Sequence, residues 1–209
     1  MQFMEELLSN TDYYNEADCF GNTTHLEMQQ KFLENGITNN RRANAMLVDG
    51  VWWEREATPT FDRMTKDDES MSKMNRRFGW MPLPQATEED AAAIANGTKK
   101  SVYLDAMEAV TCVKSGLPDG VKNAALALMK YVYTDKALAD FTYTTGTTIG
   151  VDYLDALDGT KLTPFENSLV DYIKKSDYVG KVSGSTFYAA NITQFQTFNV
   201  FSCGNSDIV

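Results

Sequence analysis

The sequence has no apolar run long enough to cross a bilayer, and its first residues, MQFMEELLSN, show no basic region followed by an apolar stretch. Cysteine is scarce: Cys19, Cys112 and Cys203 are widely spaced and form no CxxC pair, which indicates neither a disulfide framework nor a zinc site. The single histidine, His25, lies just inside a predicted helix start. A surface or capping role is favoured there over catalysis.

Basic residues are also in short supply, with 19 Lys and Arg against 29 Asp and Glu, a net charge of −10. This charge repels phosphate backbones and anionic headgroups, so nucleic acid is a poor candidate partner. The sequence contains no GxxxxGK, GxSxG or HExxH motif. We therefore predict that the protein is not an enzyme, and expect no catalytic residue, cofactor or metal.

What is present is a globular composition enriched in rings, with 11 Phe, 10 Tyr and 3 Trp among 209 residues. That length can bury one substantial core or two small ones. N-cap residues, capping boxes and helix-ending glycines predict helices over 24–36, 87–96, 118–132, 134–146 and 163–175, and apolar residues predict one over 3–8. The third of these has the clearest apolar periodicity, which predicts a core-facing stripe of Val121, Ala124, Ala125, Leu128, Met129 and Val132.

Strand patterns lie between these helices. Residues 45–48 form an apolar run closed by Asp49 and Gly50, which predicts a buried strand ending in a glycine-permitted turn. Residues 78–81 predict a strand ended by prolines, 102–113 a strand crossing between two parts of the structure, and 185–202 an extended tail. The alternation of strands and helices favours an α/β class, and helices 118–132 and 134–146 would form a hairpin.

The most informative group of residues is the segment Asp49-Gly50-Val51-Trp52-Trp53-Glu54, where a turn brings indoles and carboxylates together. An aromatic ring offers a flat apolar face to the C–H face of a pyranose, and carboxylates accept hydrogen bonds from its hydroxyls. The sequence therefore predicts a sugar-binding site. The same tryptophans could instead pack in a core.

Two other functions fit the same residues. Asp49 and Glu54 could act as the acid and base of a glycoside hydrolase, depending on their separation. The chain could also be a protein interaction module.

At this segment the chain resembles family 1 extracellular solute-binding proteins, the class that contains maltose-binding protein. Residues 45–52, AMLVDGVW, are similar to the family's Ala-Met segment with its Gly-x-Trp, and GWMPLP at 79–84 to its strand ending in a proline pair. The helices at 121–133 and 134–146 follow in family order. The family's Phe and Gly before Ala-Met are replaced here by NNRR at 39–42.

The resemblance, which runs from about residue 32 to 151, implies a class II periplasmic-binding-protein-like α/β fold of two lobes, with much of the amino-terminal lobe missing. Residues 1–101 would then belong to the carboxy-terminal lobe. Residues 102–150 would supply a crossover strand and a helical hairpin to the amino-terminal lobe, and 151–209 would return to the carboxy-terminal lobe and form a tail. The chain would be a fragment whose uncovered apolar surface favours self-association.

The resemblance also implies a non-catalytic role: binding a sugar or oligosaccharide for the permease subunits of an ABC importer. By position, Trp52 would stack on the sugar, with Trp53, Glu54 and Asp49 as neighbours, while Trp80 would pack in a core. The full-length protein would be extracellular, as a lipid-anchored lipoprotein or in the periplasm. Neither a signal nor a lipid-bearing cysteine motif is found in this chain.

Overall fold

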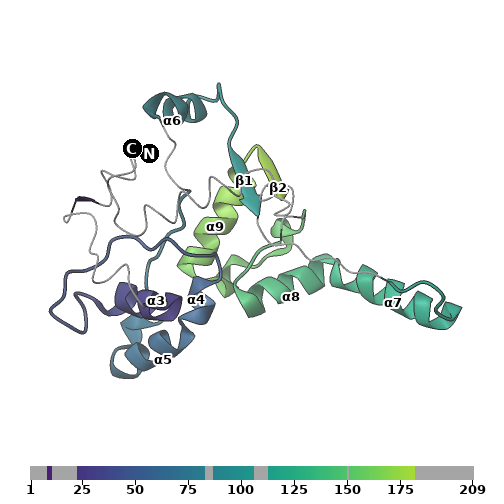
Figure 1. Cartoon of the computed structure of the whole chain (residues 1–209), viewed down its shortest axis with the longest axis horizontal. Helices are drawn as coiled ribbons and strands as arrows, with labels where there is room; N and C mark the ends of the chain where they lie inside the picture. Colours follow the sequence, from purple (N-terminus) through teal and green to yellow (C-terminus); the bar gives the residue numbers. More distant parts are fainter. Residues whose placement is uncertain (1–8, 11–22, 83–86, 106–112, 150, 182–209) are drawn as a thin grey trace. The chain divides into compact units, whose positions relative to one another are not determined.

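The computed structural model describes residues 9, 10, 23–82, 87–105, 113–149 and 151–181 (Figure 1). The chain divides into two compact units. The first contains the described residues up to Phe61, and the second contains those from Asp62 onward. The predicted helix at 3–8 and the predicted extended tail at 185–202 lie outside the described residues.

The first unit is helical. Helix α3 (His25–Glu34) begins with the predicted capping box, in which Thr24 Oγ1 accepts from the Glu27 backbone N–H and the Glu27 carboxylate accepts from the Thr24 backbone N–H. Helix α4 (Trp53–Glu56) is a single turn, and α5 (Thr58–Asp67) begins almost directly after it, with the boundary between the units falling inside α5. The core of this unit contains Leu33, Trp53, Ala57 and Phe61, all nearly fully buried.

The second unit combines helices with one small sheet. Its helical elements are η1 (Glu69–Met71), α6 (Glu88–Ala95), α7 (Asp119–Val132), α8 (Asp135–Thr145), η2 (Leu154–Ala156), η3 (Gly159–Lys161) and α9 (Pro164–Lys175). Strands β1 (Val102–Asp105) and β2 (Tyr178–Lys181) pair in parallel, with Val102 opposite Tyr178 (Figure 1). The apolar core is formed mainly by Leu138, Tyr153, Leu154, Leu162, Phe165, Leu169, Val170 and Ile173.

Helix α9 is the best-anchored helix of the second unit. Thr163 caps it with the predicted capping box, and Pro164 occupies its first turn. Leu169, Val170 and Ile173 recur at helical spacing and are buried, as predicted from the sequence.

An aromatic cluster connects the loop at 78–82 with β1 and α9. The Trp80 ring packs against Tyr172 of α9 at 4.5 Å between ring centroids and against Tyr103 of β1 at 5.9 Å. The Trp80 backbone N–H donates to Ser168 Oγ over 2.6 Å. Trp80 is therefore packed on two sides but only partly buried, and it is not among the fully buried core residues.

Two predicted strands are wrong. Residues 45–48 form no strand, and the side chains of Met46 and Val48 are largely exposed. Residues 78–81 also pair with no strand among the described residues. Both predictions rested on local apolar content, whereas a strand needs a neighbour whose N–H and C=O groups match its own. Of the predicted strand at 102–113, residues 102–105 form β1, and 106–112 lie outside the described residues.

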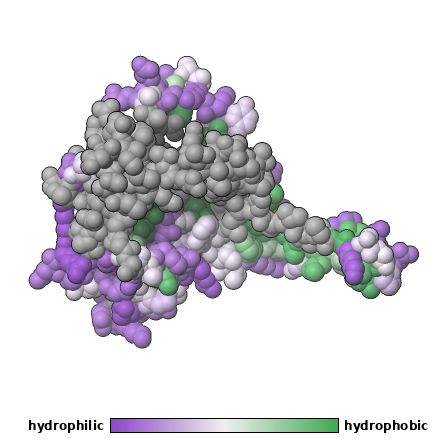
Figure 2. Space-filling model, viewed as in Figure 1, coloured by the Kyte–Doolittle hydropathy of each residue, from purple (hydrophilic) through white to green (hydrophobic). Residues whose placement is uncertain are grey.

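The prediction that α7 turns an apolar face to the core is also wrong. The helix forms as expected after Pro118, but none of its residues is buried. Val121, Leu128 and Val132 are all exposed, so apolar and polar residues lie side by side at the surface of α7 (Figure 2). A periodic stripe indicates which face of a helix can be buried, but burial also requires a surface that packs against it.

The remaining predicted helices are confirmed. Thr87 caps α6, and Thr134 caps α8, which ends at Gly146 in the left-handed conformation.

Among the described residues, no helix combines the length and apolar character needed to cross a membrane. The two-lobe α/β architecture and its division at residues 101 and 150 stay predictions.

Candidate functional site

The predicted sugar-binding segment forms a turn in the first unit. The chain reaches Asp49 without regular structure, the Gly50 carbonyl accepts from the Trp53 backbone N–H over 3.1 Å, and α4 begins at Trp53. The Asp49 carboxylate also accepts from the Gly50 backbone N–H over 2.6 Å. We call residues 49–56 the Trp52 turn.

Gly50 is needed for a reason that the sequence did not indicate. Its φ does not lie in the left-handed region, so the turn itself does not demand glycine. The Trp52 ring lies so close to the backbone that a Cβ at position 50 would stand 2.5 Å from ring atoms Cε2 and Cζ2. Glycine therefore lets the indole rest directly on the main chain.

The two indoles of the Trp52 turn occupy different environments. Trp53 is only 5% exposed, and its ring centroid lies 5.6 Å from that of Phe32, which it meets edge-on, and 6.0 Å from that of Phe61, to which it is tilted. Trp52 is 40% exposed. Trp53 thus anchors the turn in the core, while Trp52 presents part of its ring to the surface.

The two predicted carboxylates also separate. Asp49 is exposed, whereas Glu54 is only 4% exposed. Of the four residues predicted for the site, the structure therefore brings Asp49 and Trp52 to the surface of one turn and leaves Trp53 and Glu54 inside.

A polar contact that the sequence did not predict lies beneath the turn. The amide nitrogen of Gln29 donates to Asp49 Oδ2 and to Glu56 Oε2, each over 2.8 Å, and Gln29 is fully buried. His25, one helical turn before Gln29, places Nε2 3.9 Å from Glu56 Oε1. The available signal was helical spacing: Gln29 stands four residues before Leu33, on the buried face of α3.

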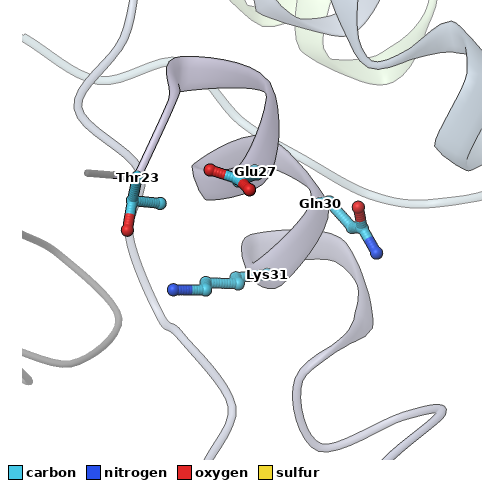
Figure 3. A pocket seen from close by; sticks show the side chains of 4 residues that line it. All are labelled: Thr23, Glu27, Gln30 and Lys31. Carbon is cyan, nitrogen blue, oxygen red and sulfur yellow. The ribbon is translucent and has the colours of Figure 1, made fainter. Parts of the chain in front are cut away.

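A separate open pocket of about 440 Å³ lies along α3, lined by Thr23, Glu27, Gln30 and Lys31 (Figure 3). Its lining is polar, and Glu27 is already engaged in the helix cap. None of the residues predicted for the site lines this pocket. It offers no aromatic surface for stacking.

Within the part of the chain that the structure describes, no group of three or more His, Cys, Asp or Glu side chains is placed to hold a metal ion. The Trp52 turn presents a partly exposed ring at Trp52 and, three residues earlier, the hydrogen-bonded carboxylate of Asp49. Comparison of the chain with protein-family models, with curated proteins and with solved structures gives no match.

Proposed function

We propose that the chain binds a neutral carbohydrate without chemical turnover, as the ligand-binding component of an ABC importer. The observation that carries the binding role is the Trp52 indole, which is partly exposed, rests on Gly50 and belongs to the same turn as the exposed Asp49. A ring in this setting stacks on the apolar face of a pyranose, and the carboxylate accepts from its hydroxyls. The import role is supported by the resemblance of residues 45–52 to solute-binding proteins.

The packing around the turn also suits a binding role. The Trp53 ring packs in the core against Phe32 and Phe61, and this packing holds the backbone of the adjacent Trp52 in place. A platform held in place before the ligand arrives loses less entropy on binding. The excess of acidic residues favours neutral sugars over uronates and sugar phosphates.

The first prediction tests the stacking role. Titration calorimetry with glucose, maltose, cellobiose and xylobiose should identify at least one ligand. Trp52→Ala should weaken the binding of that ligand at least tenfold, because the stacking surface is lost. Tyr131→Ala is the matched control, since Tyr131 is an exposed ring on α7, outside the turn. Equal binding by the Trp52→Ala protein would contradict the proposal.

The same preparation separates binding from hydrolysis. A chromogenic glycoside should be released no faster than in buffer, and Glu54→Gln should leave that rate unchanged. Measurable turnover that disappears in Glu54→Gln would favour a glycoside hydrolase using Asp49 and Glu54. For the import role, permease genes adjoining the gene are the expected finding.

A further inference from the structure

The Gln29 amide lies beneath the Trp52 turn and contacts both of its ends. Its Nε2 donates one hydrogen to Asp49, the first residue of the turn, and the other to Glu56, the last. A primary amide has two N–H donors, and both are used here. The two acceptor oxygens consequently lie no more than about 5.6 Å apart.

This arrangement holds together two groups that would otherwise repel each other. Asp49 and Glu56 are both carboxylates, and their like charges favour separation. Two hydrogen bonds from one amide offset this repulsion and link the carboxylates, because hydrogen bonds to charged acceptors are stronger than those between neutral groups. The ends of the turn are therefore kept close by a residue 20 and 27 positions away in the sequence.

At this position a glutamine lowers the stability of the folded state relative to an apolar side chain. It has 0% exposure, and its Oε1 is buried without a hydrogen-bond partner among the described residues. A buried acceptor without a partner opposes folding, and an apolar side chain of similar size would avoid that cost. Residues that break such local rules concentrate at functional sites.

We propose that Gln29 is the positioning residue of the Trp52 turn: by bridging Asp49 and Glu56 it fixes the orientation in which the Trp52 indole rests on Gly50. The inference rests on the proposed function only where it names Trp52 as the surface on which a sugar stacks. Gln29 itself is buried and touches no ligand. Its effect on binding is carried by the turn.

The test reads the indoles directly. The three tryptophans, labelled with 5-fluorotryptophan, give three fluorine resonances, which Trp→Phe variants assign. Gln29→Leu should move the Trp52 resonance by more than its linewidth and leave Trp80, in the second unit, unmoved. Gly50→Ala is the positive control, because the added methyl must displace the Trp52 ring. Gln30→Leu is the matched negative control: Gln30 is the neighbouring glutamine on α3 and bonds to Glu34.

An exchange of side chains then separates bridging from simple packing. Gln29→Glu places a third carboxylate in the cluster and should move the Trp52 resonance as Gln29→Leu does. Adding Glu56→Gln to that variant returns an amide to the cluster at position 56, with the charge of the native protein. The Trp52 resonance should then return toward its native position. Should Gln29→Leu fail to fold, Glu56→Ala, which removes one end of the bridge, is expected to give the same Trp52 shift.

Three results would overturn the proposal. These are an unmoved Trp52 resonance in folded Gln29→Leu, an equal movement of Trp80, and a failure of the double variant to restore the signal. The readout needs no ligand, so a chain that binds none of the four sugars would refute the proposed function and leave this test intact. If maltose binds, Gln29→Leu should raise its dissociation constant about tenfold, the order expected for one or two lost hydrogen bonds.

Discussion

The carboxylate of Glu166 caps α9 and lies close to Gly146, at the carboxy-terminal end of α8. One oxygen accepts from the Thr163 backbone N–H over 2.7 Å and completes the cap of α9. The other lies against Gly146, where a Cβ would stand 2.7 Å from it and where φ is +70°. Burial is the main cause that raises the pKa of Glu166 above its ordinary value of 4.5, although the Thr163 hydrogen bonds and the charge of Lys73 oppose it.

A raised pKa in the folded state means that ionisation of Glu166 opposes folding. The protonated Glu166 carboxyl favours the folded state, and this contribution to stability is lost as the pH rises from 4.5 through the folded pKa. We predict that Glu166→Gln, which keeps a capping side chain without the charge, is more stable than the native chain at pH 7 by less than about 1 kcal/mol. Urea unfolding at pH 4 and pH 7 measures this. An advantage that is larger at pH 4 would show the sign to be wrong.

Among the elements, α7 and α9 carry similar apolar stripes in different surroundings. Leu169 of α9 is fully buried, whereas Leu128 of α7 is 63% exposed. We predict that Leu169→Ala lowers the free energy of unfolding by about 2–5 kcal/mol, and that Leu128→Ala changes it by no more than about 0.5 kcal/mol. Urea unfolding of the two variants provides the comparison. A comparable loss for Leu128→Ala would mean that the α7 stripe is covered in solution.

The same contrast explains how far the sequence could predict the fold. Helix starts at Thr24, Thr87, Thr134 and Thr163 were correct, because a cap is a contact within three residues. Strand β2 was not predicted, since its pairing with β1 depends on residues more than 70 positions away. At the site, closeness in the sequence was enough to predict that Asp49 and Trp52 share one turn. The burial of Trp53 and the hydrogen bond from Gln29 to Asp49 depend on residues distant in the sequence, so the local pattern could not predict them.

The whole molecule is acidic, with a net charge of −10 and a pI near 4.6. A field of this sign repels phosphate backbones at long range, and low salt strengthens the effect. We predict no change in the fluorescence anisotropy of a labelled 20-base-pair duplex at about 50 mM salt, up to micromolar protein. Saturable binding that weakens as salt is added would contradict this prediction and indicate a local basic surface.

The parallel pairing of Val102 with Tyr178 has a consequence for synthesis of the chain. The ribosome makes β1 first and must add the whole of α7, α8 and α9 before β2 exists. At about 5–20 residues per second, β1 waits roughly 4–15 s for its partner. During that interval its free edge is open to strands of neighbouring nascent chains. Slower translation between these strands should therefore increase aggregation, and a chaperone that shields β1 should reduce it.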